Sequence, residues 1–396
     1  MEEKQMNELL HQTVQDAKET LVADRRWLHS HAEISFQEKE TTAWLCAQLE
    51  KIEGLTISRP TATGAVATLS TGRPGPVVAF RADIDALQMT EATGLPFASK
   101  NPNAMHSCGH DGHAAVLLNS ARILAGMRDE LRGEARFLFQ HAEEVPPGGA
   151  AEMVQAGVVD GVEEVYGLHF TSSLPTGRFG VRSGVLTSAT DRFDITVKGK
   201  GGHSAIPQEC VDPVVIGAQI VLALQGIISR RLDPSQVAVL SICQVSGGSA
   251  YNIIPHTIQL TGSVRTFDKT VRENVRLWIE ETARGIAQAQ KGDIDFGYSY
   301  GYGCVVNDPA LTEAASDVIR GVFGPQAVVA IGPQMPGEDF CHFHEKCPGF
   351  FVEVGAASEE KGITAPHHNP HYQLDEDALP LAVEYVTNLL RSRLKR

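Results

Sequence analysis

Hydrophobic residues recur along the first half of the chain with two different spacings. Apolar positions every three to four residues predict amphipathic helices at residues 7–28, 38–52, 114–127 and 150–156. Short apolar runs predict strands at residues 64–69, 76–82, 135–139 and 164–168. Because the two kinds of segment alternate, we predict an α/β fold in which helices flank a mixed sheet.

The pattern changes near residue 188. It predicts, in order, a strand at 192–197, a helix at 213–230, strands at 237–245 and 257–265, a helix at 269–289 and a strand at 294–300. This β-α-β-β-α-β order is that of the ferredoxin-like arrangement, which forms a complete small domain. We therefore expect residues 188–301 to form a domain of their own.

After residue 302 the α/β pattern returns. It predicts helices at 309–322, 338–345 and 375–394 and a strand at 349–354. This piece looks too small to build its own core, so we expect residues 1–187 and 302–396 to form one discontinuous domain. The alternative is two sequential domains followed by a third unit. A length of 396 residues favours two domains.

Candidate metal-binding side chains gather next to the predicted strands. Glu143 and Glu144 follow one strand and His169 directly follows another, and strand ends are where open α/β sheets bind ligands. Residues 108–113 (Cys-Gly-His-Asp-Gly-His) and the pair at 367–368 (His-His) add thiol and imidazole groups. Sulfur, nitrogen and oxygen donors together indicate a transition-metal site. A second, unligated Glu is what metal-assisted hydrolysis needs as proton acceptor.

Composition narrows the partners and the compartment. A formal net charge of −14 at pH 7 argues against binding to nucleic acid or to a membrane surface and leaves a small-molecule substrate. Seven scattered cysteines, an odd number, are typical of a reducing compartment. The polar start of the chain and the lack of a run near eighteen apolar residues predict neither a signal peptide nor a membrane span. We expect a cytoplasmic location.

Five motifs carry a resemblance that covers nearly the whole chain. They are Cys108-Gly109-His110-Asp111-Gly112-His113, Gln140-His141-Ala142-Glu143-Glu144, Gly167-Leu168-His169, Gly199-Lys200-Gly201-Gly202-His203 and His368-Asn369-Pro370. The chain resembles the dinuclear metallopeptidases of the aminoacylase and carboxypeptidase G type. It is most similar to their amidohydrolase branch, which includes hippurate hydrolase and indoleacetyl-amino acid hydrolase. Segments 26–29, 81–87, 252–255 and 338–340 match as well.

The resemblance implies two divalent metal ions per subunit, of Zn, Mn, Co or Ni. The implied ligands are Cys108, His110, Glu144, His169 and His368. Cys108 would bridge the ions, where related branches use an aspartate. A shared metal-bound hydroxide would attack the amide carbon, with Glu143 as general base. The alternative for Glu143 is a carboxylate that only orients a ligand.

The resemblance also assigns the inserted domain as a lid and dimerisation domain. Asn252 and Arg265 would clamp the α-carboxylate of the substrate, and His203 would donate to the scissile carbonyl, from the lid of a partner subunit. Taken alone, Arg265 on a strand predicts a surface ion pair and His203 a solvated loop histidine. A homodimer or dimer-based oligomer is thus expected, with a lid that closes over the substrate.

The expected reaction is hydrolysis of the linear amide bond of an N-acyl-amino acid, which releases a carboxylic acid and a free amino acid. Dipeptidase or carboxypeptidase activity on a short peptide is the alternative within the family. Two further alternatives are a cysteine hydrolase, with Cys108 as nucleophile and His110 as base, and a non-catalytic homologue that binds a ligand.

Two positions depart from the family pattern without removing a ligand. His141 stands where a proline usually precedes Ala-Glu-Glu, and residues 29–33 read His-Ser-His-Ala-Glu where the family has His-x-x-Pro-Glu. We expect His141 at the surface or behind the ligands, rather than tuning the pocket or the pKa of Glu143. His106 and His113 are expected to orient the cysteine loop.

Overall fold

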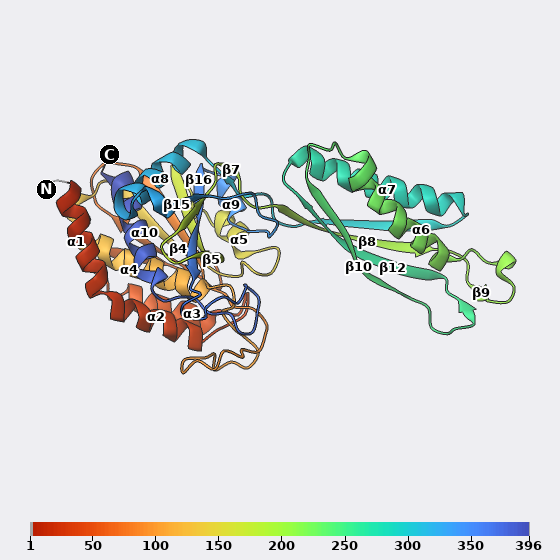
Figure 1. Cartoon of the computed structure of the whole chain (residues 1–396), viewed down its shortest axis with the longest axis horizontal. Coiled ribbons are helices and arrows are strands. Elements are labelled where there is room, and N and C mark those ends of the chain that lie inside the picture. Colours follow the sequence, from red (N-terminus) through yellow and green to blue (C-terminus); the bar gives the residue numbers. More distant parts are fainter. Residues whose placement is uncertain (1–2, 396) are drawn as a thin grey trace. The chain divides into compact units, whose positions relative to one another are not determined.

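The computed structural model describes residues 3–395 and divides the chain into two units (Figure 1). The main unit comprises Met1–Leu186, Val305–Gly332 and Asp339–Arg396. The inserted unit comprises Thr187–Cys304 and the six residues Pro333–Glu338. Each unit has its own hydrophobic core, so each is described by itself.

An eight-stranded mixed sheet forms the centre of the main unit. Its strands, in spatial order, are β1 (Leu55–Ser58), β2 (Ala65–Ser70), β4 (Glu134–Gln140), β3 (Val77–Asp83), β5 (Glu164–Pro175), β16 (Gly349–Ala357), β6 (Phe179–Val181) and β15 (Val328–Ala330). The central strands β4, β3, β5 and β16 are parallel to one another, whereas β1, β2 and β6 add antiparallel pairs. The predicted mixed α/β sheet is confirmed.

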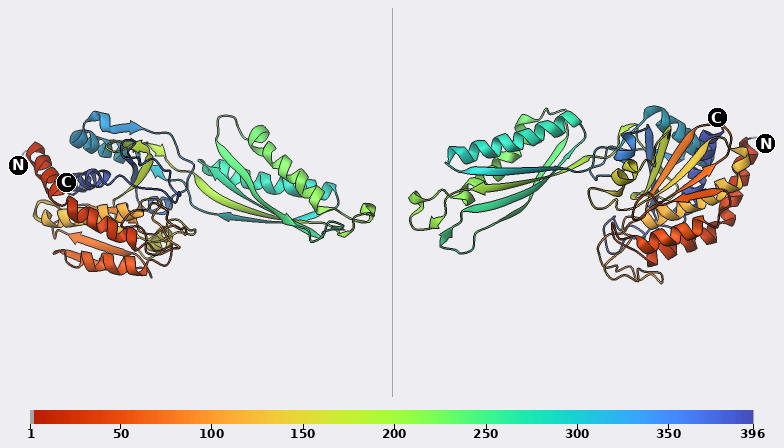
Figure 2. Two further views of the ribbon diagram at one scale, coloured as in Figure 1. Left: turned by 60° about the horizontal axis from the view of Figure 1, so that its bottom comes forward. Right: turned by 180° about the vertical axis from the view of Figure 1, so that it is seen from behind.

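Helices flank this sheet (Figure 2). They are α1 (Glu3–Asp16), α2 (Lys18–Ser30), α3 (Lys39–Leu49), α4 (His110–Gly126), α5 (Gly149–Gln155), α8 (Pro309–Phe323), α9 (Cys341–His344) and α10 (Ala378–Leu394). Helix α4 is buried on nearly every side, between α2, α10 and the sheet. Burial of side chains such as Leu117 and Leu118 stabilises it by roughly 1.5–3 kcal/mol each. This anchored helix begins at His110, one of the predicted ligands.

The inserted unit has the strand and helix order predicted for it. The elements are β8 (Ala189–Lys198), α6 (Pro213–Gly226), β10 (Ala238–Gly247), β12 (Thr257–Thr266), α7 (Lys269–Ala289) and β13 (Asp293–Tyr300). The sheet order is β10-β12-β8-β13 and all neighbours are antiparallel, as in a ferredoxin-like arrangement. Alternate residues of β8, among them Phe193 and Ile195, pack against α6 and α7.

Two small sheets complete the topology. In the inserted unit, β9 (Gly202–His203) pairs with β11 (Ile253–Ile254) beside the turn that connects β10 to β12. In the main unit, β7 (Gly184–Val185) pairs with β14 (Val306–Asn307), so the segments that enter and leave the insertion lie side by side.

Several predicted boundaries were wrong. The helix expected at 7–28 is two helices, because the chain turns at Ala17. The strand expected to end at 168 continues to Pro175 as β5, since its parallel pairing with β16 extends beyond His169. His169 therefore lies within the strand rather than after it. The edge strand β1 was missed because it is only four residues long and half-exposed.

The expectation that no segment could span a membrane also needs correction. The segment Pro213–Arg231, which includes α6, is long and apolar enough to do so by length and composition. A single such helix is weak evidence for a membrane span, and packing supplies another reason for its composition. Ile216, Ile220 and Leu224 of α6 are buried in the core of the inserted unit.

Candidate metal centre

Cys108 occupies the centre of the predicted ligand cluster. Its Sγ and ligand atoms of His110 and Glu144 all lie within 4.8 Å of one another, and the same is true of Cys108, His169 and His367. The thiol is thus the one group that these two sets share. This is the geometry expected of a bridging ligand.

His110 and Glu144 aim their free ligand atoms at a common space. The Nδ1 of His110 donates to the main-chain oxygen and carboxylate of Asp85, at 3.0 and 3.2 Å, which leaves Nε2 for another partner. That Nε2 lies 3.9 Å from Oε1 of Glu144, and both atoms are buried without a hydrogen bond among residues 3–395. Buried polar atoms normally have partners, so a cation between them is the natural occupant.

The electrostatics of the cluster also fit cations. Burial and the carboxylates of Glu144 and Glu143 raise the pKa of the Cys108 thiol well above its usual range. Burial lowers the pKa of His110, but Asp83, Asp85 and Glu144 outweigh it and raise that pKa to about 10. So many negative groups around a thiol and an imidazole favour a divalent cation, which stabilises a thiolate and replaces the imidazole proton.

His169 reaches the thiol from the neighbouring strand. Its Nδ1 donates to the main-chain oxygen of Phe170 at 2.6 Å, and its Nε2 lies 3.3 Å from Cys108 Sγ. Burial and nearby histidines hold the pKa of His169 well below its usual range. The ring is therefore a neutral imidazole, the form that binds metals.

The consecutive histidines 367 and 368 approach the cluster differently. His368 places Nε2 3.4 Å from Oε1 of Glu144, and its side chain is 56% exposed. His367 is more enclosed: its Nε2 accepts the N–H of Ser172 at 3.3 Å, so its Nδ1 carries the proton and lies 3.8 Å from Cys108 Sγ. His367 is thus placed to donate to the sulfur, a contact that the sequence analysis missed although it quoted the pair.

His113 and His106, the other two histidines near the cysteine loop, differ in their hydrogen bonds. His113 donates from Nδ1 to Asp83 at 2.6 Å and accepts the N–H of Phe170 at Nε2, so both of its nitrogens are used. This agrees with its expected structural role. His106 is buried, and among the described residues neither ring nitrogen has a hydrogen-bond partner. Burial lowers its pKa to about 4, so the ring is neutral.

Two residues of the segment 81–87 hydrogen-bond to residues in and around the cluster. Asp85 holds His110 and also accepts the N–H of Glu144 at 3.1 Å and the hydroxyl of Ser35 at 2.7 Å. Arg81 donates to Gln140, Asp83 and Asp339 at 2.6–2.8 Å. The segment was quoted as a family match with no role assigned. An acidic residue just after a buried strand was the available signal.

Glu143 and His141 lie on the turn after β4. Glu143 is 8% exposed, and one of its carboxylate oxygens is within 4.8 Å of one of Asp339. His141 is buried rather than at the surface, and its Nε2 lies 2.8 Å from a carboxylate oxygen of Glu152. His141 thus has a partner for one ring nitrogen in the position where the family usually has proline.

In the inserted unit, His203 and Asn252 lie together and Arg265 lies apart. The pairing of β9 with β11 brings His203 beside residue 253, and the N–H of Ser204 donates to the main-chain oxygen of Asn252. Arg265 is near the other end of β12, paired with Thr190. At about 3.3 Å per residue, roughly 26 Å of strand separates it from the end near Asn252.

Arg265 is also without an ion-pair partner. Burial lowers its pKa, and within residues 3–395 no carboxylate forms a salt bridge with it. The surface ion pair that an isolated strand arginine would suggest is therefore wrong. His203 is exposed, and its Nδ1 accepts the N–H of Ala205 at 3.1 Å.

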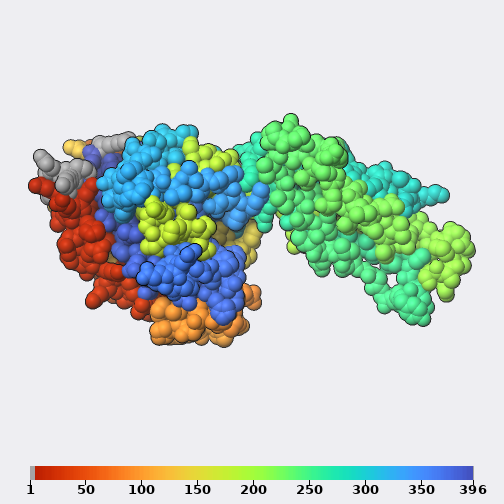
Figure 3. Space-filling model, in the orientation of Figure 1, coloured from red at the N-terminus to blue at the C-terminus, as the bar shows by residue number. Residues whose placement is uncertain are grey.

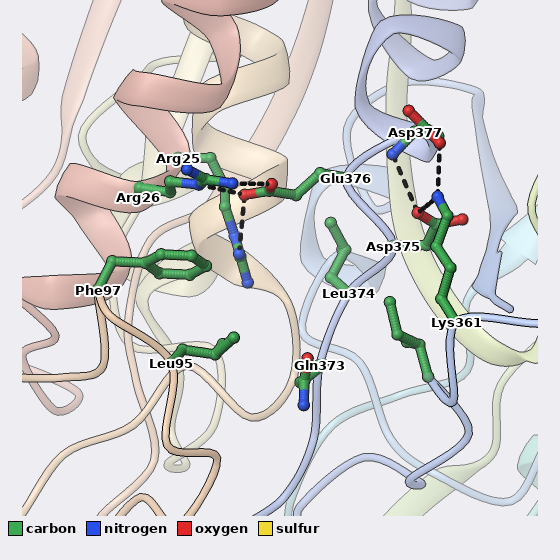
Figure 4. A pocket seen from close by; sticks show the side chains of 11 residues that line it. Arg25, Arg26, Leu95, Phe97, Lys361, Gln373, Leu374, Asp375, Glu376 and Asp377 are labelled. Carbon is green, nitrogen blue, oxygen red and sulfur yellow. Dashed lines mark hydrogen bonds and ion pairs between the residues drawn. The ribbon is translucent and has the colours of Figure 1, made fainter.

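A separate cavity of about 260 Å³ in the main unit contains none of the predicted ligands (Figure 4). Its charged groups pair with one another: Glu376 contacts Arg26 at 2.6 Å and Arg25 at 3.3 Å. Arg25 also contacts Asp111, the residue after His110, at 2.7 Å. The cavity is therefore a neighbour of the cysteine loop and not the metal centre.

Comparisons with known proteins identify the family of this chain. Residues 79–392 match the family model "Peptidase family M20/M25/M40". The chain is 49% identical over 294 residues to an N-acyl-L-amino acid amidohydrolase of Geobacillus stearothermophilus, covering 74% of this chain and 80% of that protein. It is 42% identical to an N-acetylcysteine deacetylase of Bacillus subtilis (strain 168), covering 93% and 95%.

A solved structure from the same family has a similar fold. The Bacillus subtilis YXEP protein, described as a dinuclear metal binding peptidase from the M20 family, superposes with a TM-score of 0.85 at 37% identity, covering 96% of this chain and 99% of that one. Together with the two ligand sets that share Cys108, this likeness supports a centre for two divalent metal ions. The chain belongs to peptidase family M20/M25/M40.

Proposed function

We propose that this protein hydrolyses the amide bond of N-acyl-amino acids and releases a carboxylic acid and a free amino acid. The observation that carries the proposal is the gathering of Cys108, His110, Glu144 and His169, with His368 beside Glu144, around buried ligand atoms that make no hydrogen bond among the described residues. Glu143 is next to Glu144 in sequence. Relatives named as an N-acyl-L-amino acid amidohydrolase and an N-acetylcysteine deacetylase point to the same bond.

The same five residues are proposed as the ligands of the two ions. Cys108 is common to both groups of possible ligands, the second of which contains His367 rather than His368. His169 approaches the thiol from β5, and Glu144 faces His110 and His368. Mixed sulfur, nitrogen and oxygen donors are compatible with Zn, Mn, Co or Ni. When bound, such ions polarise the scissile carbonyl and lower the pKa of water.

Glu143 is proposed as the general base. It takes a proton from the attacking water and returns it to the leaving amine, a transfer that amide hydrolysis requires. Glu144 is less suited to this role, because its Oε1 faces the imidazoles of His110 and His368, as the proposed ligand role requires. The two adjacent carboxylates therefore have separate roles.

The electrostatic surroundings of Cys108 disfavour a cysteine hydrolase. A nucleophilic cysteine needs a lowered pKa, whereas burial and two glutamates raise the pKa of Cys108. A non-catalytic homologue is disfavoured for another reason, since binding alone has no use for the buried Glu143 beside a complete ligand set.

In the inserted unit, Arg265 is proposed to bind the α-carboxylate of the substrate, and Asn252 and His203 to bind its carboxylate and carbonyl. Arg265 has an unpaired guanidinium, which suits a carboxylate. About 26 Å of strand is longer than an N-acyl-amino acid, so one inserted unit cannot apply both groups to one substrate molecule. We therefore infer that a second copy of the chain supplies His203 and Asn252.

A homodimer is proposed to form through β10 and α6. Strand β10 is an edge strand with exposed Val239 and Val245, and α6 exposes Leu222 to 75%. Unpaired edges next to exposed apolar residues are typical of an interface. A Leu222→Glu substitution should convert the dimer to monomers in light scattering, and an unchanged mass would contradict the interface.

A cytoplasmic location is also part of the proposal. It is supported by the seven cysteines, which form no disulfide in the part of the chain that the structure describes.

Metal analysis coupled to a hydrolysis panel tests the function. The panel would contain N-acetyl-, N-benzoyl- and indoleacetyl-amino acids together with dipeptides. We expect two metal equivalents, loss of activity with chelator, and recovery with added Mn, Zn, Co or Ni. Preference for dipeptides would indicate a peptidase instead. Activity that survives the chelator and is lost on thiol alkylation would indicate a cysteine hydrolase.

A further inference from the structure

The main chain just before Glu143 adopts a conformation that needs outside support. Ala142 has φ +51°, in the left-handed region that a residue with a side chain seldom occupies. Such residues persist only where surrounding contacts hold them, and they are concentrated at functional sites. Here the strained residue comes directly before the proposed base and the proposed ligand Glu144.

Glu38 supplies such a contact from a distant part of the chain. Its Oε1 accepts the N–H of Ala142 at 2.8 Å and that of Phe36, another left-handed residue with φ +65°, at 2.9 Å. Glu38 immediately precedes α3, yet its side chain does not cap that helix. Its carboxylate is fully buried. One buried oxygen thus holds two strained peptide groups.

Other contacts hold the rest of the turn but not this peptide group. The main-chain oxygen of Ala142 accepts the N–H of Gly149 at 3.1 Å, and the N–H of Glu144 donates to Asp85. Without Glu38, the buried N–H of Ala142 would lose its acceptor, which would favour a return to an ordinary conformation. That change would turn the peptide that leads into Glu143 and Glu144.

We propose that Glu38 is a positioning residue, which keeps Ala142 left-handed and so directs Glu143 as base and Glu144 as ligand. This role rests on the proposed function and deepens it. Glu38 acts through a hydrogen bond to the main chain and does not touch the substrate.

The test compares three substitutions that separate the acceptor from the charge. Glu38→Gln keeps an oxygen at the same reach and removes the charge. Glu38→Asp keeps the charge but withdraws the oxygen by about 1.5 Å. Glu38→Ala removes both. If the hydrogen bond matters, kcat and metal affinity should rank wild type, then Gln, then Asp, then Ala, with the Ala variant 10- to 100-fold below wild type.

Glu33→Ala is the matched control. Glu33 lies in the same segment, and its carboxylate accepts the N–H groups of Glu40 and Thr41 at the start of α3, at 3.1 and 2.8 Å. Its loss should lower the melting temperature without lowering kcat or metal affinity. A second-site change gives another readout: Ala142→Gly in the Glu38→Ala background should recover at least part of the loss, because glycine needs no support at positive φ.

The outcomes are distinguishable. An Asp variant equal to or better than the Gln variant, or an Ala variant equal to the Glu33→Ala control, overturns the proposal; if the Ala variant does not fold, the Gln and Asp ranking decides. A wild type that binds metal but hydrolyses no N-acyl-amino acid refutes the proposed function alone, since metal affinity still ranks the variants. A wild type that binds no divalent metal overturns both.

Discussion

The two units place their candidate functional residues in opposite environments. In the main unit, Glu143 is buried, and His110 and Asp85 are buried and hydrogen-bonded to each other before any substrate arrives. In the inserted unit, His203 is exposed and Arg265 has no ion-pair partner in the described chain. This difference fits the proposed roles, in which the main unit holds the catalytic groups in place in advance and the inserted unit keeps an unpaired guanidinium for the substrate.

This contrast predicts that substitutions in the two units affect different kinetic constants. Changes in the main unit should lower kcat or metal affinity, because they disturb groups that act on the reacting atoms. Changes at the carboxylate-binding residues of the inserted unit should raise KM, because they remove groups that hold the substrate, whereas His203, proposed to bind the carbonyl, is outside this rule. The predictions that follow test this division.

The largest effect is expected for Glu143→Gln. The side-chain amide of glutamine cannot accept the proton of the attacking water, so kcat should fall by roughly 10²- to 10⁴-fold. Metal content, measured by mass spectrometry, should stay at the wild-type value, because Glu144 and the histidines remain. The control is Glu152→Gln, whose carboxylate contacts only His141 among the residues of this turn and should leave kcat within about threefold. A variant that lost its metal would identify Glu143 as a ligand instead.

A smaller effect is expected for Asp85→Asn. Asp85 orients His110 and holds the N–H of Glu144, and loss of such contacts typically costs 10- to 100-fold in metal affinity. Competition with a fluorescent chelator would measure it. Asp24→Asn is the matched control, because Asp24 is also buried in the main unit but bonds to Asn119 and Arg122. Equal metal affinities for the two variants would remove Asp85 from the centre.

Arg265 gives the counterpart in the inserted unit. Arg265→Ala should raise KM by about 10- to 100-fold, since a hydrogen bond to a charged group is worth about 1.5–3 kcal/mol, and kcat should change far less. Arg265→Lys should not restore KM, because lysine lacks the planar fork. Arg192→Ala is the control: Arg192 is on the neighbouring strand and already pairs with Asp194 at 2.8 and 2.9 Å. A loss confined to kcat would break the division between the units.

The sequence predicted the two units unequally well. In the main unit, Cys108, His110 and the glutamate pair stand in short motifs. The chemistry of their side chains indicates a metal site even when the fold is not known. Asp85 and Glu38 could not be found in this way, because their roles depend on contacts across 59 and 104 residues of sequence. An acidic residue looks the same in sequence whether its side chain faces solvent or is buried against a strained peptide.

In the inserted unit, periodicity predicted the elements but not the function. The alternation in β8 and β12 was enough to give the sheet, since one face packs on helices. The strand predicted at 257–265 already separates Arg265 from Asn252, but the pairing of β9 with β11, which brings His203 beside Asn252, is seen only in the structure. The partner subunit was expected from the family resemblance and not from periodicity, and the distance along β12 gives the proposal a geometric reason.

The smallest effect concerns acid stability, and it sharpens the contrast between buried and exposed charges. Burial raises the pKa of Glu91, but hydrogen bonds from His29, Ser99 and Thr93 outweigh it and lower that pKa to about 2, from 4.5. A carboxyl with a lowered pKa stabilises the fold above its unfolded pKa, and this stabilisation is lost as pH falls from about 4.5 towards 2. Glu91→Gln should therefore melt at a lower temperature than wild type at pH 6, and this difference in melting temperature should narrow steadily below pH 4.5.

Asp194→Asn in the inserted unit is the control, because Asp194 also has a lowered pKa but pairs with Arg192 in solvent, where such pairs contribute little to stability. If both variants showed the same pH-dependent gap in melting temperature, burial would not be what separates the two units.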